Sequence, residues 1–266
     1  MTTSPAPDAP SPSEFREFRD ADLRGARFVD SDLRGAVLRG VDIDGAEIDS
    51  PWLLEGGATL VVNGVDVPPL VDAELNRRFP GREMRRAVDP EGLRAAWEAL
   101  QGTWAATIAR ASALPEGAVE ESVGGEWSFA QTLRHLVLAT DLWLGRAVLS
   151  SERPFHPLGL ANPQAADEGL DMSAFTTATP TFAEVLEARA GRVALVRDFI
   201  GAVTAGQLAE PRTNPWSPEH PETVLSCLHT IFEEEWEHHR YAVRDLDALA
   251  ASSTDVENRR AAPSMG

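Results

Sequence analysis

The chain of 266 residues contains no lysine, because all 24 of its basic residues are arginine. A P-loop uses a lysine to bind nucleotide phosphates, and pyridoxal-phosphate enzymes use one for their Schiff base. Typical members of both enzyme classes are therefore excluded. Cysteine is almost absent as well, and the single residue Cys227 can form neither an internal disulfide nor a cysteine-rich zinc site.

Positive charge is scarce beside the 42 acidic residues, and the formal net charge is −18. This charge disfavours binding to the phosphate backbone of nucleic acids and to anionic membrane surfaces. No apolar run reaches membrane-spanning length, and the first residues lack the apolar segment of a signal peptide. We therefore expect a cytoplasmic protein that binds neither nucleic acid nor membrane.

A five-residue repeat follows the first residues. Large apolar side chains recur at every fifth position, namely Phe18, Leu23, Phe28, Leu33, Leu38, Ile43 and Ile48. This period matches neither a helix nor an ordinary strand, but it fits a solenoid in which each pentad forms one side of a coil. The segment resembles the pentapeptide-repeat family, whose pattern is A(D/N)LxG, and the resemblance implies a right-handed β-helix. Seven pentads make fewer than two coils, so we expect a structural or scaffolding role.

The next residues predict a small β-hairpin. The apolar run Leu60–Val62 meets the turn dipeptide Asn63-Gly64, and apolar residues then alternate until two prolines. A strand cannot continue through consecutive prolines, so the hairpin is expected to end there. We assign residues 57–89 to this hairpin and a linker.

The rest of the chain predicts four amphipathic helices. Asp89-Pro90 is typical of a helix start, and Ser128 and Thr181 can cap the second and third helices. Pro221 suits the first turn of the fourth helix. The apolar spacings place the helices at about 90–112, 128–150, 182–204 and 221–250. Four such helices with two long loops, one of them at 151–180, indicate a mainly α protein with a four-helix bundle.

Polar residues interrupt two apolar helix stripes. On the fourth helix, Glu235 and His239 lie one turn apart on the stripe of Leu228, Ile231, Ala242, Leu246 and Leu249. On the second helix, His135 shares a face with Leu138 and Leu142. A buried carboxylate needs a cation, an arginine or a proton. The sequence therefore predicts a metal site formed by His135, Glu235 and His239, with an open coordination position as in catalytic zinc sites.

Two alternatives remain open for these residues. The acidic run at 233–237 leaves the register uncertain, and the other register pairs Glu234 with His238. Alternatively, the histidine of the second helix is a hydrogen-bonded core residue, and the acid and histidine of the fourth helix form an ion pair on a wet face.

Two regions resemble the DinB/YfiT-like family, namely WSFAQTLRHL at 127–136 and EEEWEHHRYAVRDL at 233–246. The resemblance implies a four-helix bundle with a divalent metal bound by three residues, which match His135, Glu235 and His239. The chain is similar to the mycothiol-dependent maleylpyruvate isomerase branch in having a glutamate among them. His238, Arg240 and His156 are expected to orient the ligands or line the pocket, or else to lie on the surface.

These observations predict an organisation and a function. The expected segments are a disordered tail at 1–13, the repeat segment at 14–56, the hairpin and linker at 57–89, the DinB-like bundle at 90–250 and a disordered tail at 251–266. The resemblance implies an enzyme with a divalent metal (Zn, Ni, Mn or Fe). This enzyme would be a transferase or isomerase that uses a low-molecular-weight thiol, such as mycothiol, and acts on a small-molecule electrophile. A metal-dependent hydrolase is a second possible activity, and a homodimer is a possible assembly. The alternative is a non-catalytic scaffold or binding protein in which the metal is structural or absent.

Overall fold

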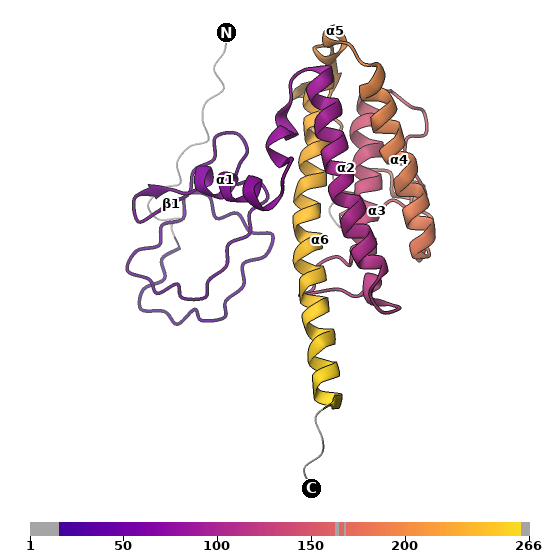
Figure 1. The fold of residues 1–266 in the computed structure, drawn as a ribbon. Coiled ribbons are helices and arrows are strands. Elements are labelled where there is room, and N and C mark those ends of the chain that lie inside the picture. Colours follow the sequence, from indigo (N-terminus) through magenta and orange to yellow (C-terminus); the bar gives the residue numbers. More distant parts are fainter. Residues whose placement is uncertain (1–15, 163–164, 168, 262–266) are drawn as a thin grey trace, which may run out of the picture. The chain divides into compact units, whose positions relative to one another are not determined.

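The computed structural model describes residues 16–162, 165–167 and 169–261, and of residues 252–261 it describes the backbone alone. The chain divides into two compact units, the first ending at Asp49 and the second beginning at Ser50. The expected tail at 1–13 lies outside the described residues. The chain is mainly helical, with two small antiparallel hairpins (Figure 1).

Tight turns repeat every ten residues in the first unit. The N–H groups of Ala26, Ala36 and Ala46 donate to the carbonyl three residues earlier at 2.9 to 3.0 Å. In each turn a glycine with a φ of 72° to 75° precedes the alanine, a conformation that is strained for other residues. Two pentads therefore make one structural period.

The large apolar residues of the pentads are exposed in the structure. The exposed set comprises Phe18, Leu23, Phe28, Leu33, Leu38, Ile43 and Ile48. A repeat buries its apolar face only against neighbouring repeats, and this segment contains only seven pentads. No strand forms within residues 16–49, so the right-handed β-helix stays a prediction.

The predicted β-hairpin is confirmed. Strand β1 (Val61–Val62) pairs antiparallel with β2 (Val65–Asp66), and the two-residue turn between them is Asn63-Gly64. Both turn residues have positive φ, 51° and 84°, as a tight turn that matches the strand twist requires. The prolines that end the hairpin also begin a helix, α1 (Pro68–Arg78), because proline suits the first helical positions.

The second unit contains four long helices. They are α2 (Pro90–Ser112), α3 (Phe129–Thr140), α4 (Phe182–Ala202) and α6 (Val224–Ala261). The π-helix η3 (Asp141–Val148) continues α3. The side chain of Asp89 caps α2, and Ser128 and Thr181 form capping boxes with the residues three positions later. These starts agree with the sequence signals, whereas α6 extends beyond residue 250, where the apolar pattern ends.

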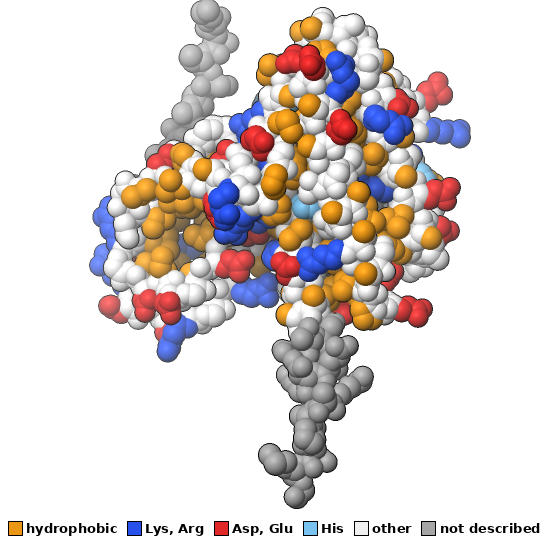
Figure 2. All heavy atoms as spheres, viewed as in Figure 1, with side chains coloured by type: hydrophobic (Ala, Val, Ile, Leu, Met, Phe, Trp, Pro, Cys, Tyr) orange, Lys and Arg blue, Asp and Glu red, His pale blue; other side chains and the backbone are white. Residues whose placement is uncertain are grey.

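The four long helices pack in pairs around one core. Helix α3 packs against α4 and α6, and α2 packs against the same two helices (Figure 1). The largest fully buried side chains come from α2, α3, η3, α4 and α6, and they include Trp104, Leu133, Leu144, Ile200 and Phe232. On the surface, acidic, basic and hydrophobic side chains are interspersed (Figure 2). Within the described part of the chain, no helix has the length and apolar character that a membrane crossing requires.

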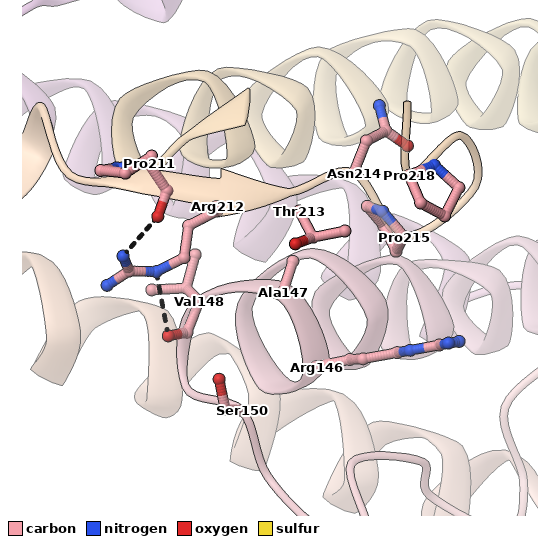
Figure 3. Close-up of a pocket in the computed structure, with 10 residues that line it drawn as sticks. All are labelled: Arg146, Ala147, Val148, Ser150, Pro211, Arg212, Thr213, Asn214, Pro215 and Pro218. Carbon is pink, nitrogen blue, oxygen red and sulfur yellow. Dashed lines mark hydrogen bonds between the residues drawn. The ribbon is translucent and has the colours of Figure 1, made fainter. Parts of the chain in front are cut away.

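A second hairpin precedes the last helix, in a segment whose sequence predicts a loop. Short helix α5 (Ala205–Leu208) precedes strand β3 (Pro211–Thr213), which pairs antiparallel with β4 (Pro221–Thr223). Pro221 therefore lies in a strand and not in the first turn of the last helix. Between this hairpin and the end of η3 lies an open groove of about 450 Å³ (Figure 3). Arg212 lines this groove, and its side chain donates hydrogen bonds to the backbone carbonyls of Val148 and Pro211.

The cap of α4 gives a prediction about stability. The substitution Thr181→Ala removes the hydroxyl that accepts from the Glu184 N–H, so the free energy of unfolding should fall by about 1 kcal/mol. Thr181→Ser keeps the hydroxyl and should leave stability nearly unchanged. Urea denaturation followed by circular dichroism measures both variants, and equal stability of the two would contradict the role of this cap.

Candidate metal centre

Two helices bring three potential metal ligands together. His135 comes from α3, and Glu234 and His238 lie one turn apart on α6. The Oε2 atom of Glu234 is 3.4 Å from Nε2 of His135 and 3.3 Å from Nε2 of His238. The three ligand atoms all lie within 4.8 Å of one another, and no other described group of three His, Cys, Asp or Glu residues does so. We call His135, Glu234 and His238 the trio.

The trio is partly open to solvent and is braced by a tryptophan. The side chains of His135, Glu234 and His238 are 17%, 32% and 16% exposed, so none of the three is fully buried. The Trp127 ring lies 4.7 Å from the ring of His135 and 6.0 Å, almost parallel, from that of His238. This indole restricts the rotation of both imidazoles.

A backbone carbonyl fixes the orientation of the His135 ring. The Nδ1 atom lies 3.1 Å from the carbonyl oxygen of Leu160, which can only accept a hydrogen bond, so Nδ1 donates to it. This contact directs Nε2 toward the Glu234 carboxylate, 3.4 Å away. Either a proton or a divalent metal can lie between these two atoms.

The charges in the trio also favour a cation. Burial by itself would raise the pKa of Glu234, but hydrogen bonds with His135 and His238 outweigh it and hold the pKa well below its usual range. Burial lowers the pKa of His238, with the Glu234 carboxylate opposing this effect. At neutral pH the Glu234 carboxylate is therefore ionised. The His238 imidazole lies beside it, and burial disfavours the protonated form of this ring.

The structure places the two predicted partners of His135, Glu235 and His239, in the core and not in the trio. Both side chains are almost completely buried, at 1% and 2% exposure. The Arg189 side chain donates from Nη2 to Oε2 of Glu235 at 2.5 Å. The open alternative, Glu234 with His238, is the pair that faces His135. The buried acid thus has an arginine of α4 as its charged partner.

His239 is held as a neutral core residue. Its Nε2 lies 2.8 Å from Oγ1 of Thr107, and this hydroxyl itself donates to the carbonyl of Thr103, so it accepts from the imidazole. The rings of Trp104 and Phe79 pack edge-on at 5.0 and 5.6 Å. Burial lowers the pKa of His239 to about 4, which keeps the imidazole uncharged at neutral pH.

The residues expected to surround the ligands have different roles. His238 belongs to the trio itself. Arg240 donates to Glu237, and its guanidinium lies 4.3 Å from the Tyr241 ring. His156 lies in the loop after η3, where its backbone N–H donates to the buried Asp141.

Three features of the site were not identified from the sequence. They are the Leu160 carbonyl, the Trp127 ring and the pairing of Arg189 with Glu235. The tryptophan could have been proposed, because it directly precedes the cap of the helix that carries His135. The carbonyl has no sequence signal, because any residue supplies one.

The pair between Arg189 and Glu235 gives a prediction about stability. Arg189→Met leaves a buried carboxylate without its cation, so the free energy of unfolding should fall by about 3–5 kcal/mol. The double variant Arg189→Met with Glu235→Met removes both charges and should recover most of this loss. Urea denaturation of the single and double variants measures the difference. A double variant less stable than Arg189→Met would contradict the account.

Comparison with known families agrees with this architecture. A model of the DinB superfamily matches residues 99–242, more than half of the chain, and this range contains the whole trio. A model of pentapeptide repeats matches residues 17–49 in eight copies, one more than the seven pentads counted from the apolar positions. No curated protein and no solved structure gives a significant match. The chain belongs to the DinB superfamily and carries pentapeptide repeats at its N-terminal end.

Proposed function

We propose that the protein is a divalent-metal-dependent enzyme of the DinB type, with His135, Glu234 and His238 as the metal ligands. The observation that carries this proposal is the convergence of three ligand atoms from two helices within 4.8 Å. The hydrogen bond between His135 and the Leu160 carbonyl supports it, because it holds the ring with Nε2 directed at the carboxylate.

The donor set suits a borderline transition metal. Two imidazoles and one carboxylate are the ligands of many catalytic zinc sites, and the same set is compatible with Ni, Mn or Fe. Three protein ligands leave a coordination position for a substrate or for water. The partial exposure of all three side chains supports access from solvent.

The proposed reaction is a thiol-dependent transfer or isomerisation that uses a mycothiol-type thiol and a small electrophile. A divalent metal at the trio would lower the pKa of a thiol that binds to it, so that the nucleophilic thiolate forms at neutral pH. Side chains of the protein provide the binding site for this metal. Glu234 and the imidazoles of His135 and His238 would hold it, and Trp127 forms an apolar wall beside them.

The sole cysteine does not supply the thiol. Cys227 is fully buried in the core, and burial raises the pKa of its thiol to about 12. A thiol with so high a pKa is almost wholly protonated at neutral pH and is a poor nucleophile. The nucleophile in the proposed reaction is therefore an external thiol.

We also infer that α2, α3, α4 and α6 form the four-helix bundle of the family. The pairwise packing of each helix against two others supports this inference. For the repeat segment we propose a structural role. A segment of only eight repeats gives no extended surface for a large partner, and this limit supports the proposal.

Metal binding tests the proposed ligands directly. In isothermal titration calorimetry with Zn²⁺, the wild-type protein should bind one ion per chain. His135→Ala, Glu234→Gln and His238→Ala should each weaken binding by roughly 100-fold or more, because a lost ligand costs more than a lost outer partner. His239→Gln tests the other register and should retain the affinity, as should His220→Ala on the exposed surface.

Binding that depends on His239 but not on His238 would contradict the proposed ligands. For the reaction, zinc-loaded protein should consume an electrophile with mycothiol, and a chelator should abolish the reaction. No turnover with mycothiol, bacillithiol or glutathione would contradict the transferase and isomerase assignment. If the metal raises the midpoint of thermal unfolding but supports no reaction, the alternative of a non-catalytic scaffold with a structural metal is favoured.

A further inference from the structure

The repeat segment leaves large apolar side chains exposed along its whole length. Phe18, the first of the pentad positions, is 65% exposed, and Ile48, the last, is 71% exposed. The five between them are 47–67% exposed. Figure 2 shows hydrophobic side chains gathered around a hollow in this segment, whose course is traced in Figure 1. Repeat arrays bury such residues by stacking on a further repeat, and a large exposed apolar patch on a protein marks an interaction site.

The backbone of the segment is also largely unpaired. Among residues 16–48, backbone hydrogen bonds form only the three turns that end at Ala26, Ala36 and Ala46. The other N–H and C=O groups form no ladder, because no strand forms within these residues. A stretch of backbone with free donors and acceptors is a template for pairing with another chain. The segment therefore offers apolar and main-chain groups to a partner that has the same spacing.

The charges of the segment are divided along its length. Residues 16–40 contain six arginines and five acids, whereas residues 41–48 contain three acids and no arginine. Ion pairs within the segment join Arg19 to Glu17, Arg24 to Asp22 and Arg34 to Asp32. Among the described residues, the side chains left without an ion pair include Arg27, Arg39, Asp44 and Glu47. The segment is thus electrostatically complementary to a second copy of itself.

A second copy matches this charge pattern better than the rest of the chain does. Residues 50–266 contain 31 acids and 18 arginines, so their net charge complements the arginines of the segment but repels its acidic end. In a two-fold dimer the arginine-rich part of each copy meets the acidic part of the other, and every contact occurs twice. A stable interface uses about 20–30 residues a side, which residues 16–48 can supply.

We propose that two copies of the chain associate through residues 16–48 in a two-fold arrangement. The pentads of one copy lie against those of the other, so that the large apolar side chains of both are covered. The repeat segment is then a dimerisation element that joins two helical units in one assembly. This inference rests on the structural role proposed for the segment and is independent of the metal centre.

The first test compares two substitutions that add the same charge to the full-length chain. Leu33→Glu places an acid at a pentad position, and Val37→Glu places one at an exposed valine outside those positions. In sedimentation-equilibrium ultracentrifugation the wild-type protein should be a dimer. Leu33→Glu should weaken the dimer by about 100-fold or more, because the lost apolar contact occurs twice. Val37→Glu should leave the dimer nearly unchanged, and circular dichroism should show wild-type helix content in both.

The second test exchanges charges between copies and does not alter the apolar positions. One variant combines Arg27→Glu with Arg39→Glu, and the other combines Asp44→Arg with Glu47→Arg. The segment already has arginines at the equivalent positions of an earlier coil, Arg24 and Arg27, so the second variant keeps residue types that the repeat accepts. Each variant alone should dimerise about 10-fold more weakly, because both contacts join like charges. An equal mixture should form heterodimers with nearly wild-type affinity.

The outcomes separate this inference from the metal centre. A wild-type chain that stays monomeric overturns the inference, even if it binds zinc as proposed. A dimer that withstands Leu33→Glu overturns it too, because the interface then lies elsewhere, and so does equal weakening by Leu33→Glu and Val37→Glu. A mixture of the charge variants that forms no heterodimer, or assemblies that grow beyond two copies, overturns the two-fold arrangement.

Discussion

The rotation of α6 about its own axis determines which residues can form the candidate metal centre. Arg189 of α4 reaches the buried Glu235 of α6 and thereby turns this carboxylate toward the core. Consecutive residues on a helix project about 100° apart, so Glu234 then lies on the neighbouring face. His238 follows one turn later on that same face, where His135 of α3 meets it. The exposed site thus depends on a buried ion pair that takes no part in it.

Local signals in the sequence predicted much of the fold. The caps at Asp89, Ser128 and Thr181 and the turn at Asn63-Gly64 each depend on a few adjacent residues. Such features form from short-range hydrogen bonds and backbone preferences, so the sequence contains the whole signal. The second hairpin was missed because its strands are short and begin with prolines, which usually argue against a strand.

The register of the site could not be predicted in the same way. Residues 233–237 offer four glutamates, and each of two adjacent histidines has an acid one turn earlier. The apolar stripe correctly identified Glu235 and His239 as buried, but a buried polar group can be stabilised by more than one kind of partner. An arginine from α4 pairs with the acid and a threonine hydroxyl from α2 accepts from the histidine. These partners depend on tertiary packing, and so does the Leu160 carbonyl.

Crystallography of the zinc-soaked protein, with anomalous diffraction at the zinc edge, tests the central claim most directly. The account predicts a zinc peak at about 2.0–2.2 Å from Nε2 of His135, Nε2 of His238 and a carboxylate oxygen of Glu234. Glu235 should remain paired with Arg189. A zinc ion between Glu235 and His239, or a crystal saturated with zinc that shows no peak at the trio, would contradict the account.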